Sequence, residues 1–238
     1  MSETARRVAI ITGGSQGIGA GLVAGYRRRG WAVVASARTI KPSEEPDLLT
    51  VSGDIAEPAT ADQIADAALS RFGRIDTLVN NAGIFIAKPF TDYTDEDYEA
   101  VTGVNLRGFF EVSRSAIAAM LAREGGGHVV NLSTSLVDHA NSEVHSALAS
   151  LTKGGLNAVT KALAIEYAGR GIRVNAVGLG VIRTPMHPPA THGTLAALHP
   201  LGRMGEVDDV VDAIVYLESA RFVTGEILHV DGGQSAGH

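Results

Sequence analysis

The chain has 238 residues, a formal net charge of −6 at pH 7 and no cysteine. This length suits one α/β domain with a large core. The absence of cysteine excludes disulfides, thiolate catalysis and Cys-bound metal, and it is typical of a reducing compartment, so we expect a cytoplasmic protein. The negative charge comes without a basic block, which argues against nucleic acid or an anionic membrane as a partner.

Membrane insertion and metal binding are not expected either. The N-terminal residues lead directly into the first predicted strand, so we expect no signal peptide. No apolar run approaches the roughly 20 residues of a membrane span. The eight histidines are scattered without the spacing of metal ligands, so no metal site is predicted.

Glycines gather where a first strand turns into a first helix. Residues 8–11 form an apolar run that predicts a strand, and residues 20–29 predict a helix. Between them lies Thr12-Gly13-Gly14-Ser15-Gln16-Gly17-Ile18-Gly19. Glycine lets the backbone turn tightly and approach a ligand, while the helix N-terminus offers unpaired N–H groups. A turn in this context predicts a site for nucleotide phosphates rather than a plain strand–helix connection.

Strands and helices alternate along the rest of the chain. Short apolar runs predict further strands at residues 31–35, 48–51, 75–79, 128–132, 173–177 and 226–230. Helical spacing is found at residues 61–72, 95–123, 143–167 and 207–219. This alternation predicts an α/β fold with a doubly wound parallel sheet covered by helices on both faces. The crossover at residues 39–47 holds two prolines, so we expect it to be irregular.

Polar and glycine-rich motifs follow the predicted elements in a fixed order. They are the turn at 12–19, Asp54, Asn80-Asn81-Ala82-Gly83, Asn105, Thr152-Lys153-Gly154-Gly155, Val181-Ile182-Arg183-Thr184-Pro185 and Val230-Asp231-Gly232-Gly233. In this order they resemble the classical short-chain dehydrogenase/reductase family over nearly the whole chain. The resemblance implies a single Rossmann-type domain over residues 1–238, a nicotinamide cofactor, a small-molecule substrate and a homotetramer or homodimer.

The resemblance also implies a cofactor site spread over several loops. Its residues would be Gly13, Ser15, Gln16, Gly17, Ile18, Gly19, Arg38, Asp54, Ile55, Asn81, Ala82, Gly83, Lys153, Ile182 and Thr184. Small Ala82 and Gly83 follow the carboxyl end of a strand, where ligands gather in doubly wound sheets, and would let backbone approach the adenosine ribose. Two roles are open to Asp54: accepting from the adenine amino group, or capping the segment that begins near Ile55.

The choice between NAD and NADP depends on Ala37-Arg38. Family members that prefer NAD usually place an acid just after the second strand, where it binds the ribose 2′-hydroxyl. This chain has Ala37 there, and Arg38 follows. A missing carboxylate and a guanidinium suit a 2′-phosphate, so we favour NADP(H) and keep NAD(H) as the alternative. A solvated surface arginine is the other interpretation of Arg38.

The expected catalytic set has a gap. The family carries Asn, Ser, Tyr and Lys, with the tyrosine one helical turn before the lysine, so that both face the substrate. The lysine lowers the pKa of the phenol toward neutrality. Asn105 and Lys153 fit this set, but the residue four positions before Lys153 is Ala149. The usual proton donor is therefore absent from the position where the resemblance expects it.

The substrate-binding hydroxyl has two candidates. The family's serine falls three residues after a position such as Asn131, which gives Thr134. Counting back from Ala149 points near Leu136 instead, which indicates a longer loop. We expect Thr134 or Ser135 to bind the substrate heteroatom, with a polar strand-end turn as the alternative.

His145 is a candidate for the missing acid. It lies four residues before Ala149 and would share that face on a continuous helix. Histidine titrates near neutrality and could supply a proton there. The alternative is a half-exposed histidine at a helix entrance, and His139 is a weaker candidate.

The substrate pocket departs from the family pattern at a second place. In Gly178-Leu179-Gly180 the family usually has Pro-Gly at the last two positions, so Leu179 adds an apolar side chain near the nicotinamide. Ala149, Leu179 and His187 are expected in the pocket, with residues 186–200 as a small substrate lid. An imine can enter already protonated and needs no strong acid, so this pocket suits a cyclic imine, or a ketone served by His145 or water, with NADPH as the hydride source. The alternative is a non-catalytic NADP(H) sensor or scaffold that has lost the tyrosine.

Overall fold

A seven-stranded parallel sheet organises the protein, for which a computed structural model describes residues 6–237. The strand order is β3-β2-β1-β4-β5-β6-β7. The strands are β1 (Val8–Thr12), β2 (Ala32–Ala37), β3 (Leu48–Ser52), β4 (Thr77–Asn80), β5 (Gly127–Thr134), β6 (Ile172–Leu179) and β7 (Ile227–Val230). This order reverses direction between β1 and β4, which is where ligands bind in doubly wound sheets. The predicted fold class is confirmed.

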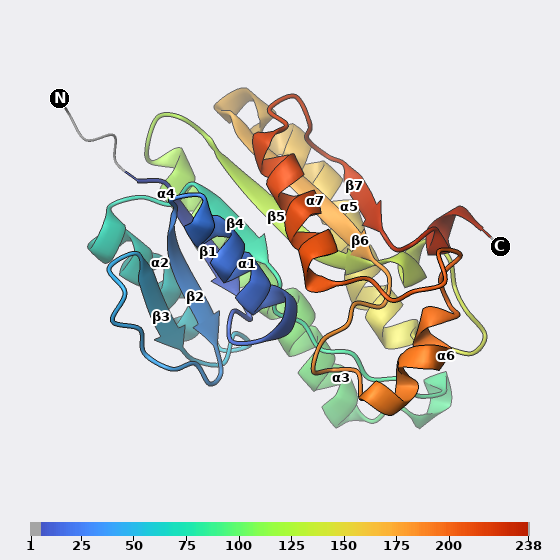
Figure 1. Ribbon diagram of the computed structural model, residues 1–238. Helices are drawn as coiled ribbons and strands as arrows, with labels where there is room; N and C mark the ends of the chain where they lie inside the picture. The colour runs from blue at the N-terminus through green and yellow to red at the C-terminus, as the bar shows by residue number, and fades with distance from the viewer. Residues whose placement is uncertain (1–5, 238) are drawn as a thin grey trace.

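Helices cover both faces of the sheet (Figure 1). They are α1 (Gly17–Arg28), α2 (Pro58–Phe72), α3 (Asp95–Thr102), α4 (Phe109–Leu121), α5 (Ala147–Tyr167), α6 (His192–Ala196) and α7 (Val207–Ser219). Helices α2, α4 and α5 contribute to the core on one face, and α1 and α7 to the core on the other. Strands buried on both faces are apolar throughout, which explains their unalternating sequences.

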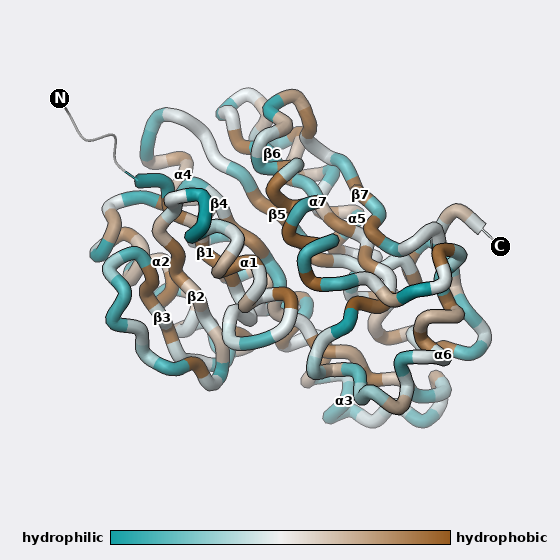
Figure 2. The backbone as a smooth tube through the Cα atoms, viewed as in Figure 1, coloured by the Kyte–Doolittle hydropathy of each residue, from teal (hydrophilic) through white to brown (hydrophobic). Residues whose placement is uncertain are grey.

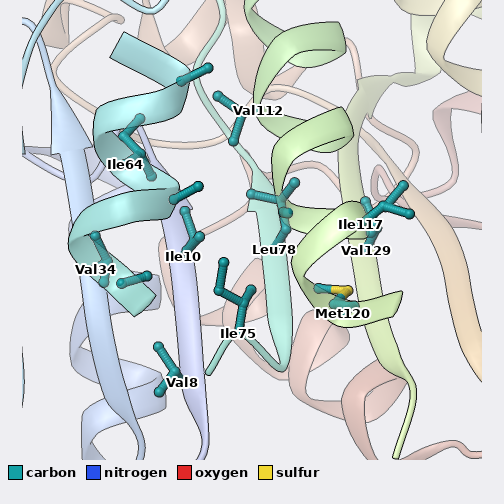
Figure 3. Packing of buried hydrophobic residues seen from close by; sticks show 14 of the residues in the cluster. Val8, Ile10, Val34, Ile64, Ile75, Leu78, Val112, Ile117, Met120 and Val129 are labelled. Carbon is teal, nitrogen blue, oxygen red and sulfur yellow. The ribbon is translucent and has the colours of Figure 1, made fainter. Parts of the chain in front are cut away.

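The core is built from neighbouring strands in register. Ile10 of β1 lies beside Val34 of β2 and Leu78 of β4. Figure 3 shows Ile64 of α2 and Val112 of α4 in the same cluster. In Figure 2, the brown that marks hydrophobic residues follows the strands beneath the helices. Truncating a residue such as Leu78, which is fully buried, would cost about 2–5 kcal/mol through lost transfer energy and a cavity.

Two predicted helices differ from those observed. The stretch predicted at 95–123 is divided into α3, a π-helical turn η2 (Gly103–Gly108) and α4. The stretch predicted at 143–167 begins only at Ala147, because the Asn141 side chain accepts from Glu143 N at 2.8 Å and holds a turn there. Side-chain-to-backbone bonds of this kind compete with the helix. The crossover at 39–47 contains no helix, as expected from its prolines.

The end of the sheet to which the strand arrows point carries residues 186–200, the segment predicted as a substrate lid. Helix α6 lies on this side in Figure 1, in the segment between β6 and α7. None of the helices within residues 6–237 is long and apolar enough to cross a lipid bilayer.

Candidate active site

A cavity of about 640 Å³ opens at the carboxyl ends of the strands. At one end it is lined by the glycine-rich turn after β1 and by the residues that follow β2, β3 and β4. At the other end it is lined by Ala149 and Lys153 of α5, Leu179 of β6 and part of the lid. One continuous cavity therefore joins the glycine-rich turn after β1 to an apolar compartment.

The turn after β1 is shaped by glycine. Gly13 and Gly17 have φ values of 68° and 53°, in the left-handed region that L side chains rarely adopt. A Cβ on Gly19 would lie 2.1 Å from the carbonyl oxygen of Gly13, so no side chain fits there. Gln16 is the N-cap of α1 but makes no side-chain capping bond, so the first N–H groups of the helix remain available for a phosphate.

Thr12 and Asn81 join the turn after β1 to the loop after β4. Asn81 Nδ2 donates to the carbonyl oxygens of Thr12 at 2.8 Å and Gly13 at 3.2 Å. The Thr12 hydroxyl oxygen accepts from Asn81 N at 3.1 Å and Ala82 N at 3.0 Å. The sequence suggested Asn81 as a cofactor ligand; its side chain positions the glycine-rich turn. Thr184 also lies against this turn, since a Cβ on Gly17 would meet its Cβ at 3.3 Å.

Arg38, Asp54 and Ile55, which the sequence predicts as cofactor residues, line the same end of the cavity as the glycine-rich turn. The Arg38 side chain is exposed, and within residues 6–237 no carboxylate pairs with its guanidinium. Asp54 Oδ1 accepts from Ala56 N at 3.0 Å. Helix α2 begins after an N-cap at Glu57, so Asp54 closes a turn before the helix rather than capping it. Ile182, buried nearby, also lines the cavity.

Lys153 and Asn105 each lie close to Gly83, and Lys153 lines the other end of the cavity. Lys153 Nζ donates to the carbonyl oxygen of Leu132 at 2.7 Å. Asn105 accepts from Ile84 N at 2.9 Å and donates back to Ile84 O at 3.1 Å. A Cβ on Gly83 would lie 3.1 Å from Lys153 Nζ and 3.4 Å from Asn105 Oδ1. The π-helical turn places Asn105 inward, as such turns often do at functional sites.

Burial gives Lys153 an unusual acidity. Desolvation lowers the pKa of its ammonium from the ordinary value to about 8. No ion pair with a carboxylate opposes this shift among the described residues. Lys153 therefore exchanges its proton closer to neutral pH than an exposed lysine does.

No tyrosine reaches this cavity. All five tyrosines lie within residues 6–237, and none of them lines it. Ala149, one helical turn before Lys153, is buried and lines the cavity together with Leu179. Other apolar side chains complete this compartment: Phe85, Leu136, Val144, Met186, Leu195 and Leu198. The reacting end is therefore largely apolar.

The two candidate hydroxyls differ in the hydrogen bonds that they already make. Thr134 and Ser135 both line the cavity. The Ser135 hydroxyl is buried between Leu179 O at 3.1 Å and Gln234 Oε1 at 2.8 Å. The Thr134 oxygen only accepts from Leu136 N, at 3.3 Å, and retains its own proton for a ligand. Gln234, which sequence reasoning missed, is buried against the same compartment.

His145 does not share the face of Ala149. Helix α5 begins two residues later, at Ala147, so the continuous helix that would have aligned them is absent. The His145 side chain is exposed and does not line the cavity, and neither does His139. His187 does line it. Burial lowers the pKa of its imidazole, and the nearby His192 lowers that pKa further.

Hydrogen bonds connect His192, in the segment predicted as a lid, to His187 and Arg183. His192 Nε2 lies 2.9 Å from the carbonyl oxygen of His187, so Nε2 carries the proton and donates it. Its other ring nitrogen, Nδ1, accepts from Arg183 at 3.1 Å. Arg183 also donates to Glu206 at 2.9 Å. His192 thus connects residues 187–192 to the loop after β6.

Comparisons with known proteins agree with this geometry. A family model described as Enoyl-(Acyl carrier protein) reductase matches residues 13–235. The chain is 36% identical over 246 residues to 3beta-hydroxysteroid dehydrogenase 1 of Eggerthella lenta, covering 96% of this chain and 94% of that protein. It is similar to the structure of 3-ketoacyl-(acyl-carrier-protein) reductase from Brucella melitensis complexed with NADH, with a TM-score of 0.88, 32% identity and coverage of 96% and 98%. A blue fluorescent protein from a metagenomic library, in complex with NADPH, gives a TM-score of 0.86, 32% identity and coverage of 96% and 97%.

Proposed function

The chain belongs to the classical short-chain dehydrogenase/reductase family, and on that premise we propose that it transfers hydride from NADPH to a C=O or C=N group of a small apolar molecule. One observation carries this proposal. A single cavity has the glycine-rich turn after β1 at one end, and Lys153 and the Thr134 hydroxyl at the other. Hydride transfer is the chemistry of the nicotinamide, and these residues would orient the acceptor group.

The apolar compartment supports a ketone or a cyclic imine as the substrate. Ala149 and Leu179 enlarge its apolar surface, and the lid adds further aliphatic side chains. Such walls bind carbon skeletons, while one hydroxyl fixes the polar atom. An imine that enters as its iminium ion needs hydride alone, so its reduction would survive the absence of a phenol.

Arg38 supports NADPH as the reductant. Its guanidinium is exposed at the nucleotide end and unpaired with any described carboxylate, and Ala37 offers no carboxylate to a ribose hydroxyl. Arginine binds phosphate through two parallel hydrogen bonds. Similar structures hold NADH in one case and NADPH in another, which supports a nicotinamide cofactor of either kind.

Steady-state kinetics test the proposal. The purified protein is mixed with NADPH and a panel of cyclic ketones and imines, and NADPH absorbance is followed. Turnover of at least one compound is the expected result. Tight NADPH binding without turnover of any of them would favour the second candidate, a nucleotide-binding sensor or scaffold, which the lack of a tyrosine in the cavity also suits.

We further propose a homotetramer or homodimer that works in the cytoplasm. Helices α4 and α5 each leave large apolar side chains exposed, including Phe110, Leu151 and Ile165. Apolar side chains exposed on neighbouring helices suit a subunit contact. Light scattering after size exclusion measures the mass of the particle directly, and a monomer at micromolar concentration would contradict this proposal.

A further inference from the structure

The titratable groups of the cavity are few. Four residues that line it carry them: Arg38, Asp54, Lys153 and His187. Arg38 and Asp54 follow β2 and β3 at the nucleotide end of the cavity. Only Lys153 and His187 therefore remain near the apolar compartment in which a substrate would react.

We infer that Lys153 itself donates the proton to the carbonyl oxygen of a ketone substrate, a role that rests on the proposed reductase activity. The reduced nicotinamide that this cavity would hold would supply hydride to the carbonyl carbon. The C=O π bond would break, and its electron pair would move onto the oxygen. That atom forms a bond to a proton of the Lys153 ammonium, which becomes a neutral amine and regains its proton from water.

The geometry of Lys153 suits a donor. An ammonium has three N–H bonds, and Leu132 O takes one of them at 2.7 Å. Among the described residues no carboxylate pairs with it, so the remaining protons are not held in an ion pair. The contact with Leu132 fixes the position of the ammonium at the floor of the cavity, and a fixed donor is what general acid catalysis requires.

Ala149 leaves room for this contact. Its side chain is a single methyl group, one helical turn before Lys153 and on the same cavity wall. A larger residue at this position would stand between a substrate and the ammonium. The substrate heteroatom is thus expected to approach Lys153 through the space that Ala149 leaves, with Thr134 as its second partner.

The pKa values of Lys153 and His187 also favour Lys153 as the proton donor. Desolvation brings the pKa of Lys153 to about 8, so the ammonium is mostly protonated at neutral pH and gives up a proton readily. The pKa of His187 is lowered from its ordinary value by burial and by His192. His187 is therefore mostly neutral at pH 7 and lies on the lid, which makes it the weaker donor.

A matched pair of substrates tests the inference. Reduction of α-tetralone needs both hydride and a proton, whereas reduction of the N-methyl-dihydroisoquinolinium ion needs hydride alone. Lys153→Arg keeps a cation that can bind the cofactor, but its guanidinium does not release a proton near neutrality. We expect kcat/KM for the ketone to fall on the order of 10²-fold or more, and that for the iminium ion to change by less than about threefold. Lys161→Arg, an exposed position on α5, is the control and should change neither.

The outcomes separate the two proposals. Equal losses for both substrates, or no loss for either, would overturn the donor role of Lys153. Wild-type turnover of the iminium ion alone would also overturn it, while leaving a reductase. Turnover of neither substrate by the wild type would overturn the reductase itself.

A pH profile of the wild type tests the same inference without relying on a variant, which could fail to fold or to bind NADPH. A donor must be protonated, so kcat/KM for the ketone should fall about tenfold per pH unit above the pKa near 8, while that for the iminium ion stays flat. NADPH fluorescence on binding gives the cofactor affinity at each pH. Parallel profiles for both substrates would contradict the inference.

Discussion

The two ends of the parallel sheet differ in whether their charged side chains have partners. At the amino ends, Asp76 accepts from Arg74 and Arg123, each at 2.7 Å. Glu218 accepts there from Thr77 at 2.9 Å, from His128 at 3.0 Å and from Tyr26 at 3.2 Å. At the carboxyl ends, the described residues give Lys153 no carboxylate partner, and the Arg38 guanidinium has none either.

The difference separates stability from function. Charges at the amino ends satisfy one another across elements distant in sequence, and they hold β4, β5 and α7 together. A buried ammonium such as that of Lys153 is costly to hold in a fold, because its desolvation is not repaid by a carboxylate partner. Donors without a carboxylate partner remain free for a ligand that brings its own negative charge or lone pairs. Changes at the two ends should therefore affect different measurements.

The largest effect is expected at the amino ends. Glu218→Ala would leave three buried donors without an acceptor, so the free energy of unfolding should fall by about 3–5 kcal/mol in urea titrations. NADPH affinity of the folded variant should stay within about twofold of the wild type. Glu218→Gln keeps the shape and one acceptor and should lose less. A large loss of NADPH affinity in folded protein would break the separation of the two ends.

A substitution at the carboxyl ends should act on rate instead. Ala149→Tyr places a phenol one turn before Lys153, so ketone reduction should rise on the order of 10²-fold in kcat/KM. Ala149→Phe supplies the same ring without the hydroxyl, stands between the substrate and Lys153, and should lower ketone reduction. Equal rates for the two variants would show that the proton supply does not limit ketone reduction.

Arg38 provides a smaller effect at the same end. Arg38→Ala should weaken NADPH binding by about 1.5–2 kcal/mol, because a charge-assisted pair with the 2′-phosphate is lost. NADH binding should hardly change, since that cofactor lacks the phosphate. Fluorescence titration with both cofactors measures this ratio, and equal losses for the two would contradict a role in selecting NADPH.

The smallest effect is expected from acid at the amino ends. Asn175 Oδ1 accepts from Glu226 N at 3.1 Å, so its amide nitrogen faces His128 Nε2, at 3.1 Å. His128 is therefore neutral, with its proton on the nitrogen that faces Glu218. Burial lowers its pKa against the opposing effect of Glu218, and Arg173 lowers it further.

The sign of this pH dependence follows from the lowered pKa. The unfolded chain binds a proton at His128 more readily than the folded protein does. The stability that depends on neutral His128 is thus fully present above the unfolded pKa, near 6.5, and is lost as the pH falls below it. Urea midpoints at pH 7 and about pH 5 measure the loss, and His128→Gln should reduce it.

The sequence predicted the strands better than it predicted the site. Short apolar runs identify buried strands because both faces are covered, so all seven were found within a few residues. The π-helical turn at 103–108 was missed, because its hydrophobic spacing continues that of its neighbours. The start of α5 was also missed, because the turn made by Asn141 competes with a helix that local propensity permits.

Long-range contacts account for what the sequence did not show. Nothing local indicates that the Asn81 amide binds the turn after β1. Gln234 reaches the cavity from the end of the chain to bond Ser135, a pairing across 99 positions that no local motif carries. Conversely, the absence of a nearby tyrosine is a local fact of the sequence, and none of the five tyrosines lines the cavity.

The contacts between Thr12 and Asn81 have a consequence for the kinetics of cofactor binding. They order the phosphate turn without any ligand, so the conformational entropy of that loop is lost during folding and not during association. Binding of a dinucleotide should then be a single diffusional encounter, with one exponential phase in stopped flow whose rate rises linearly with concentration. Loosening the loop, for example by Asn81→Ala, should add a slow, concentration-independent phase as the turn searches for its bound shape.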